Sequence, residues 1–397
     1  MNEINKLGSS RYRIARIEAF RLKSKAIKEA WTENEYGWPS TLPSLLIKVT
    51  AEDGTYGIGE ALAQHWYLSE TAEQMMTCIK LYKQALKGLD PTNIALCHHR
   101  MMGVFGTGMP GGRGARGGVD IALHDLSGKL MGLPVHTLLG GALRTEFEIL
   151  TNLYHKTPEK MAEACSYFVK LGYKGLKVKV GDVLQSKGWN RDNLLAEVAK
   201  LEAALEVTPS DVMIDADANQ GWVSAAWTIS MLQRFRSNDN LSIEQPLHYD
   251  DLAGAAHVRA HAGVPLILDE SVWSANAMMR LAKAEACDRV VVKLNRIGGL
   301  HEGRKIIDIC EAAGIGVSID MGPWTIVGNT AACHIAAVCC CPYPVDCEGH
   351  LSFTTLGEFN PFIGGVKIGE DGIACLPDLP GLGVDVDWDV LEKHLTS

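Results

Sequence analysis

The sequence contains no apolar run that approaches the roughly 18–20 residues a membrane-spanning helix needs. Its N-terminal stretch is polar and lacks the apolar core of a secretory signal peptide, so we expect neither a membrane span nor a signal sequence. A run of like charge is also missing: the formal net charge is −9, and Lys and Arg form no basic face. We therefore expect no membrane partner and no nucleic-acid partner.

Zinc-finger and disulfide patterns are absent as well. The 11 cysteines include no CxxC pair and no Cys/His spacing typical of zinc. An odd number of cysteines, three of them consecutive at Cys339, Cys340 and Cys341, is typical of small buried residues in a reducing compartment. We expect a cytoplasmic protein.

What the sequence does contain is enough chain for a barrel and one more domain: 397 residues, 47% of them hydrophobic. From Glu146 onward, short β-branched runs alternate with helical stretches, which is typical of βα units. This alternation predicts an α/β fold that contains a TIM-like (β/α)7-8 barrel. We expect eight strands in the barrel. The predicted strands cover residues 149–154, 175–180, 212–215, 241–244, 265–268, 289–293, 314–319 and 344–347.

The first part of the chain has a different pattern. Residues 13–23, 44–50 and 56–61 alternate apolar and polar side chains and predict an antiparallel meander, while residues 71–139 are mainly helical. The aromatic and acidic segment from Trp31 to Trp38 is too long for a hairpin turn, and we interpret it as a lid loop. The glycine-rich segment 106–118 is interpreted as a flexible connection in preference to a phosphate cradle, because it follows no strand. We place domain boundaries at 1–140 (α+β), 141–365 (barrel) and 366–397 (a segment returning to the first domain).

Charged residues end four successive predicted strands. Asp217, Glu244, Asp269 and Lys293 follow one another at intervals of 27, 25 and 24 residues, about the length of one strand with its return helix. In a closed barrel all four would point to one mouth. Three converging carboxylates need a cation, and hard oxygen ligands suit Mg²⁺. The alternative is that each carboxylate only caps a helix.

Two lysines lie near this predicted mouth. Lys177 and Lys179 are two apart on one strand and share a face. The two ammonium groups would lower each other's pKa, and a nearby metal would lower both pKa values further. Lys293 comes four strands later, half-way around an eight-stranded barrel. Two lysines on opposite walls could reach both faces of one carbon, while a metal stabilises the enediolate formed when an α-proton leaves a carboxylate. A solvated lysine pair on an edge strand is the alternative.

At these positions the sequence resembles the enolase superfamily, and within it the muconate-lactonising (mandelate racemase/muconate lactonizing enzyme) subgroup. The resemblance runs from about Arg13 to the end of the chain. The motifs that carry it are Gly57-Ile58-Gly59-Glu60-Ala61, Lys177 with Lys179, Asp217-Ala218-Asn219-Gln220-Gly221-Trp222, Glu244-Gln245-Pro246, Asp269-Glu270-Ser271, and Lys293 with Gly298-Gly299.

The resemblance implies that the first domain caps the barrel. It implies Mg²⁺ ligands at Asp217, Glu244 and Asp269, with Mn²⁺ as a substitute, and an acid/base pair of Lys179 and Lys293. It further implies that Lys177 orients the substrate carboxylate and assists Lys179. Substrate contacts or supporting contacts are expected from Asn219, Glu270, Asp320 and Trp324.

Two features at the seventh predicted strand refine this assignment. The mandelate-racemase subgroup has a histidine there, but residues 317–320 contain none, and His334 lies in a helical run where we expect it to be packed. Met321-Gly322-Pro323-Trp324 also departs from the Met-Leu-Glu-like stretch usual in lactonising and epimerising members. Substrate choice is therefore not transferable from the resemblance.

These observations predict a metal-dependent isomerase, a racemase, epimerase or cycloisomerase acting on a small carboxylate such as an amino-acid derivative. The alternative is a dehydratase of a hydroxy acid, such as an acid sugar or hydroxyproline, which would use the same base and metal. A non-catalytic protein would have little reason to bury this charged set. We expect a homo-oligomer.

We also hypothesise that the substrate carries a cationic or amino nitrogen, which Asp320, Trp324, Asp346, Glu348 and the lid would contact. Helix capping and packing are the alternative roles of these residues.

Overall fold

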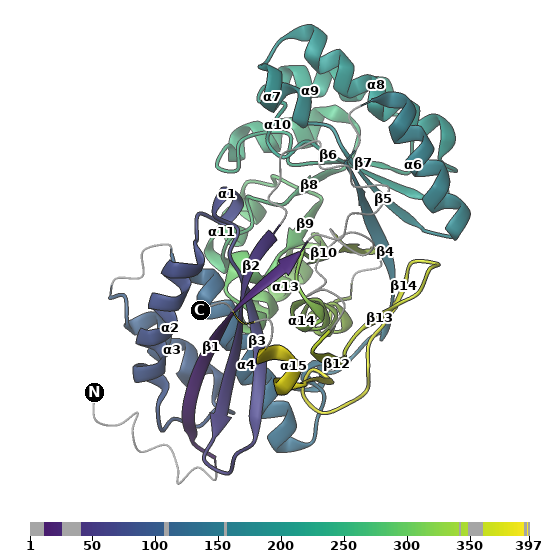
Figure 1. Ribbon diagram of the computed structural model, residues 1–397. Coiled ribbons are helices and arrows are strands. Elements are labelled where there is room, and N and C mark those ends of the chain that lie inside the picture. Colours follow the sequence, from purple (N-terminus) through teal and green to yellow (C-terminus); the bar gives the residue numbers. More distant parts are fainter. Residues whose placement is uncertain are drawn as a thin grey trace.

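The computed structural model describes residues 12–25, 41–106, 111–154, 157–340, 343–347, 360–392 and 395. Its largest unit is a closed barrel of eight parallel strands, in which β4 to β11 pair in sequence order and β11 pairs back with β4 (Figure 1). The predicted fold is therefore confirmed. The strands are β4 (Glu146–Leu153), β5 (Gly175–Lys179), β6 (Met213–Asp217), β7 (Leu241–Glu244), β8 (Leu266–Leu268), β9 (Arg289–Val292), β10 (Gly316–Met321) and β11 (Val345–Cys347).

Each of the eight predicted strands overlaps an observed one, and the ends that carry charge agree closely. Glu244 is the last residue of β7, while Asp269 and Lys293 directly follow β8 and β9. The end of β6 was predicted two residues too early, because the strand continues through Asp217. The carboxyl ends of parallel strands meet at one edge, so these side chains share the mouth of the barrel.

Helices connect the strands and cover the outside of the barrel (Figure 1). Several begin at a side-chain cap: the oxygens of Thr157, Asn190, Ser224 and Ser274 each accept from the backbone N–H three residues later. The helices are α6 (Pro158–Leu171), α7 (Asp182–Lys187), α8 (Arg191–Val207), α9 (Ala225–Leu232), α10 (Leu252–Ala262), α11 (Ala275–Lys283), α12 (Leu294–Ile297), α13 (Leu300–Ala313) and α14 (Ile326–Ala337), with a 3-10 turn at Gln233–Phe235.

The first part of the chain forms the predicted antiparallel meander followed by helices. Strands β1 (Ile14–Lys25), β2 (Thr41–Ala51) and β3 (Tyr56–Leu62) pair in order. The helices are α1 (His65–Leu68), α2 (Ala72–Leu86), α3 (Ile94–Gly103), α4 (Arg113–Met131) and α5 (Val135–Leu138). The predicted lid from Trp31 to Trp38 lies outside the described residues.

The prediction of a flexible glycine-rich connection is wrong for residues 113–118, which form the buried first turns of α4. Their glycines allow close packing. A Cβ on Gly117 would lie 3.0 Å from the Leu294 carbonyl oxygen, and one on Gly118 would lie 2.8 Å from the Ala61 Cβ. Helix α4 therefore fits between β3 and α12 only because these side chains are missing.

The C-terminal segment lies beside the first sheet. It contains β12 (Phe362–Gly364), β13 (Lys367–Ile368), β14 (Ile373–Cys375), β15 (Val384–Val386) and α15 (Trp388–Glu392). The Trp388 ring contacts Phe20 at a centroid distance of 5.4 Å and Tyr56 at 5.7 Å. Strand β14 pairs with β4, so the segment also touches the barrel. The domain boundaries at 140 and 365 stay a prediction.

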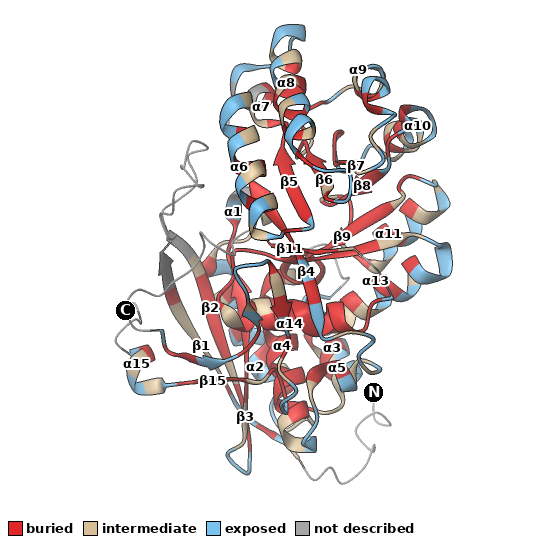
Figure 2. Cartoon of the chain, turned by 90° about the vertical axis from the view of Figure 1, so that its right-hand side faces the viewer, coloured by how far each residue is buried: buried red, intermediate tan, exposed pale blue. Residues whose placement is uncertain are grey.

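Buried residues, coloured red in Figure 2, make up most of the barrel strands and of helix α4. Buried charged residues are concentrated at the strand ends, among them Lys177, Glu244 and Asp269, each at most 1% exposed. None of the helices in the described ranges is long and apolar enough to cross a membrane.

Candidate active site

The three predicted metal ligands lie on neighbouring strands in the barrel mouth. Asp217 is the register partner of Glu244 across β6 and β7, and Asp269 follows the next strand, β8. All three are at most 1% exposed. Burial and the negative charges of Asp215 and Asp217 raise the pKa of Glu244 well above its usual range. Ionising the whole group therefore calls for added positive charge.

Strained backbone follows these strand ends. Asn219, Gln220 and Gln245 have φ of 39°, 68° and 37°, in the left-handed region that side chains rarely adopt. The Gln245 side-chain oxygen accepts from the Asp269 backbone N–H at 3.0 Å. The residue after Glu244 thus fixes the backbone that carries Asp269.

The lysines flank the carboxylates. Lys179, at the end of β5, donates from Nζ to the Asp217 carboxylate and to the Asn219 side-chain oxygen at 3.1 Å. On the other side, Lys293 follows β9, and its Nζ lies 3.3 Å from Asp269 Oδ2 and 2.9 Å from Asp320 Oδ2. Strands β5 and β9 are four apart in a closed ring of eight, so the two ammonium groups lie on opposite walls.

Lys177 lies deeper than Lys179 and is surrounded by acids. Its Nζ donates to both oxygens of Glu244, at 2.9 and 2.8 Å, and to Asp346 at 2.5 Å, with Asp215 at 3.7 Å. Burial opposes its charge, but the attraction of Asp346, Glu244 and Asp215 outweighs burial and holds the pKa of Lys177 well above its usual range. In the absence of a metal, these three carboxylates outweigh the lowering of the pKa that was expected from the neighbouring lysine.

Two residues that the sequence did not single out hold Asp269. Arg296 Nη2 donates to Asp269 Oδ1 at 2.7 Å, and the Tyr67 hydroxyl donates to Asp269 Oδ2 at 2.7 Å. Arg296 Nη1 also donates to the Tyr67 hydroxyl oxygen at 2.7 Å. Burial opposes ionisation of Asp269, but Arg296 and Lys293 keep its pKa below the usual range. Because Tyr67 belongs to α1, the first domain supports a barrel carboxylate directly.

The residues expected to contact substrate fall into two groups. Asn219 Nδ2 and Gln220 Nε2 donate to Glu270 Oε1 at 3.3 and 3.4 Å, which places Glu270 at the mouth. Burial, together with the charges of Asp269 and Asp217, raises the pKa of Glu270 to about 7. Asp320 instead pairs with Lys293.

Trp324 is 3% exposed and packs near Gly322 and Gly328, where an added Cβ would lie 2.6 and 2.1 Å from its indole. His334 is packed inside α14, as predicted: its Nδ1 accepts from the His136 backbone N–H at 3.1 Å.

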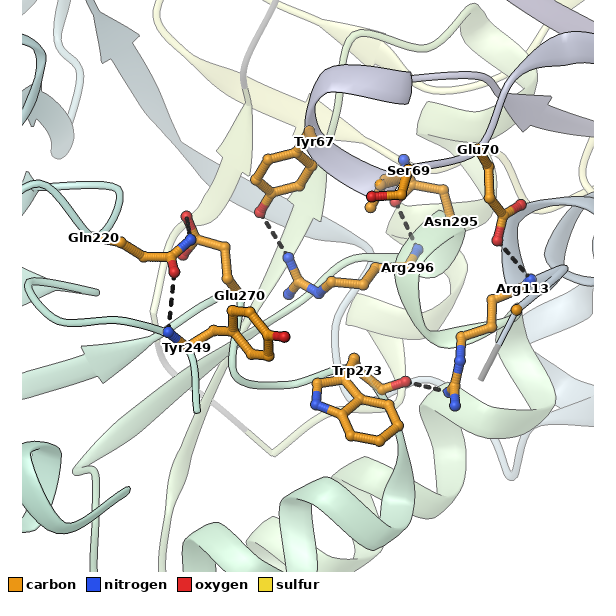
Figure 3. Close-up of a pocket in the computed structure, with 12 residues that line it drawn as sticks. Tyr67, Ser69, Glu70, Arg113, Gln220, Tyr249, Glu270, Trp273, Asn295 and Arg296 are labelled. Carbon is orange, nitrogen blue, oxygen red and sulfur yellow. Dashed lines mark hydrogen bonds between the residues drawn. The ribbon is translucent and has the colours of Figure 1, made fainter. Parts of the chain in front are cut away.

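A cavity of about 570 Å³ opens between the strand ends and the first domain. Figure 3 shows Tyr67 and Glu270 on its walls, with Tyr249 and Trp273 supplying further aromatic surface. Arg113 stacks over the Trp273 ring at 4.8 Å. The cavity therefore combines aromatic faces with a cation next to the charged strand ends, a combination suited to a small ligand with polar groups.

Comparison with known proteins places the chain in a family. Residues 35–140 match the family model described as "Mandelate racemase / muconate lactonizing enzyme, N-terminal domain", and residues 160–390 match "Enolase C-terminal domain-like". An N-succinyl-L-Arg/Lys racemase of Bacillus cereus is 31% identical over 90% of this chain and 92% of its own. A hydrophobic dipeptide epimerase of Enterococcus faecalis is 30% identical over 93% of this chain and 98% of its own.

Comparison with solved structures leads to the same family. The crystal structure of a dipeptide epimerase from Enterococcus faecalis, complexed with Mg and the dipeptide L-Leu-L-Tyr, has a TM-score of 0.79 and 27% identity and covers 95% of this chain and 100% of its own. Dehydratases of cis-3-hydroxy-L-proline and D-xylonate match at 27% and 26% identity. The chain belongs to the enolase superfamily, in the mandelate racemase/muconate lactonizing enzyme subgroup.

Proposed function

We propose that the protein is a metal-dependent racemase or epimerase that moves the α-proton of a small carboxylate from one face of the α-carbon to the other. The observation that carries the proposal is the placement of Lys179 and Lys293 on opposite walls of the mouth, with the predicted metal carboxylates on the strands between them. A racemase needs one base for each face of the carbon. Two opposed lysines provide such a pair.

We assign the metal to Asp217, Glu244 and Asp269. Three buried carboxylates offer only hard oxygen donors, which suits Mg²⁺. When bound, the cation would supply positive charge next to the substrate carboxylate and make its α-proton more acidic. Tyr67 and Arg296 would hold Asp269 in place for this role.

The lysines carry the proton. One of Lys179 and Lys293, in its neutral amine form, takes the α-proton on its own side, while the other, as an ammonium group, returns a proton on the opposite face. Each lysine thus changes its protonation state once per turnover. Lys177 stays charged because of its acidic surroundings, and it orients the substrate carboxylate and assists Lys179.

For the substrate we propose an N-acylated amino acid or a dipeptide. The 570 Å³ cavity has room for such a molecule, and its aromatic walls and Arg113 suit a side chain and a second polar group. The racemase and epimerase relatives act on molecules of this class by name. The cationic nitrogen stays a prediction: Asp320 and Asp346 pair with site lysines, and Glu33, Glu35 and Glu348 lie outside the described residues.

Incubation with a panel of N-acyl amino acids, dipeptides, betaines, hydroxyprolines and acid sugars in D₂O tests the proposal. A mass gain at the α-carbon together with loss of optical purity is the expected result. Dehydration would instead release a keto acid, which 2,4-dinitrophenylhydrazine detects, and that outcome would favour the dehydratase alternative. A panel without exchange or product would contradict both. Light scattering of the purified chain tests the predicted homo-oligomer.

A further inference from the structure

A second cluster of metal-binding side chains lies between the first domain and the barrel. It combines His98 of α3 with His301 and Glu302 in the first turn of α13. In the described part of the chain, these are the three His, Cys, Asp or Glu residues whose possible donor atoms all lie within 4.8 Å of one another. The imidazole rings of His98 and His301 lie 4.4 Å apart, measured between centroids, and are tilted by 36°.

The anchor of this cluster is His98, which is only 3% exposed. Its Nε2 is hydrogen-bonded to Asp120 Oδ1 at 2.5 Å. Its Nδ1 is buried and has no hydrogen-bond partner among the described residues. When Nε2 carries the proton, Nδ1 has a free lone pair. Buried polar atoms normally have a hydrogen-bond partner, so this lone pair calls for one.

Asp120 fixes both sides of the cluster. Burial opposes its charge, but His124 and the hydrogen bond from His98 keep the pKa of Asp120 below the usual range, so it is ionised. Its other oxygen, Oδ2, accepts from the backbone N–H of Leu300 at 2.5 Å and of His301 at 3.4 Å. One carboxylate therefore orients the His98 ring and the first turn of α13. A carboxylate that accepts from the second nitrogen of a histidine is the usual support of a metal-bound imidazole.

We propose that His98, His301 and Glu302 bind a transition-metal dication, Zn²⁺ in the first place, which joins helix α3 to helix α13. Two imidazoles and one carboxylate form a ligand set that zinc accepts, with a fourth position open to water. Imidazole nitrogen favours zinc over Mg²⁺, so this site and the oxygen site of the barrel would take different metals.

Metal binding would require the two partly buried ligands, His301 and Glu302, to turn toward His98. Zinc ligands lie about 2.0–2.2 Å from the metal, so their donor atoms must approach each other more closely than 4.8 Å. His98 is fixed by Asp120, whereas His301 and Glu302 are only partly buried and can turn their side chains toward it. Lys305 Nζ donates to Glu302 Oε1 at 2.7 Å and would compete with the metal for this oxygen.

Metal counting on the full chain tests the proposal. The protein is stripped with a chelator, loaded with excess Mg²⁺ and titrated with Zn²⁺, and bound zinc is counted after gel filtration. We expect one retained equivalent in wild type, and its loss in His301→Ala and in Glu302→Gln. Both substituted residues are partly exposed, so the folded state of each variant can be confirmed by circular dichroism. Zinc should raise the Tm of wild type but not of these variants.

The matched control is an exposed histidine pair on α10, His257 and His261, whose rings are also 4.4 Å apart. A double change of both to Ala should leave the retained equivalent in place. Co²⁺ loading should give the absorption of a nitrogen and oxygen site without a thiolate charge-transfer band, which excludes the cysteines as ligands. Equal zinc retention in wild type and folded His301→Ala, or no retention in wild type, would overturn the proposal.

Discussion

Lys179 lies directly opposite Asp217 in the register of β5 and β6, and its ammonium group donates to the Asp217 carboxylate. On the far side of the mouth, Lys293 Nζ lies 3.3 Å from Asp269 Oδ2, although the two residues are not register partners. Each proposed base therefore touches one outer carboxylate of the proposed metal site. This arrangement links proton transfer to metal binding, and the predictions below separate the two.

Removal of divalent metal is expected to abolish isomerisation, because three buried carboxylates would then lack the cation that neutralises them. Activity is measured after exhaustive chelation and again after Mg²⁺ is added back, with Mn²⁺ as a parallel addition. Mg²⁺ should restore turnover. Full turnover at a metal content shown to be negligible would contradict the assignment of Asp217, Glu244 and Asp269.

Tyr67→Phe is expected to weaken Mg²⁺ binding about 10- to 100-fold, since the hydroxyl that supports Asp269 at 2.7 Å is lost. The measurement is the Mg²⁺ dependence of kcat/KM and of binding heat. Tyr249→Phe is the control. Tyr249 lines the same cavity, and none of the hydrogen bonds described above joins its hydroxyl to Asp217, Glu244 or Asp269. An unchanged Mg²⁺ affinity in Tyr67→Phe would show that the first domain does not support the metal site.

Gly59→Ala is expected to destabilise the fold by about 1–3 kcal/mol, the usual cost of overpacking. A Cβ at this position would lie 2.1 Å from the Gly118 carbonyl oxygen and 2.6 Å from the Ala122 nitrogen, so β3 and α4 would have to separate. Gly103→Ala, where the added carbon meets nothing within 4 Å, should be close to neutral. Urea unfolding of the three proteins makes the comparison, and equal midpoints would contradict the packing argument.

The buried His334 predicts how stability depends on pH. Burial lowers its pKa to about 3, so the unfolded chain binds the proton more readily between pH 6.5 and 3. Its contribution to stability is therefore complete above pH 6.5 and falls as the pH drops, by up to about 1.4 kcal/mol per pH unit.

His334→Asn keeps a donor and an acceptor but does not titrate. The difference in unfolding free energy between this variant and wild type should shrink from pH 8 to pH 5. The value at pH 8 isolates the packing change, and a difference independent of pH would mean that His334 is not held neutral.

The sequence could predict the barrel and most of its mouth because strand ends recur at a regular interval. One strand and one helix need about the same length each time, so Asp217, Glu244, Asp269 and Lys293 were placed correctly without knowledge of their contacts. The (i, i+2) spacing likewise placed Lys177 and Lys179 on one strand.

Contacts between distant segments could not be predicted. Tyr67 reaches Asp269 from another domain, and no local pattern announces such a bond. The spacing of three residues between Lys293 and Arg296, about one helical turn, is a local signal for Arg296. The high pKa of Lys177 depends on Asp346, which joins the site only when β11 closes the barrel on β4.

The glycines of α4 show why composition misled the prediction. Glycine lowers helix propensity, so residues 113–118 suggested a loop, but tight packing against Ala61 and Leu294 favours the helix. In the same way, His98 and His301 are far apart in the sequence and meet only after the two domains dock.

The most direct test of the account is enantiomer-resolved deuterium exchange in Lys179→Ala and Lys293→Ala, with the substrate found in the D₂O panel. Each variant should lose racemisation, because each lysine serves one face of the α-carbon, and one of them should still exchange a single enantiomer. Lys174→Ala, which removes an exposed lysine paired with Asp211, should behave as wild type. Exchange of the same enantiomer at the wild-type rate by both site variants would contradict the opposed-lysine geometry.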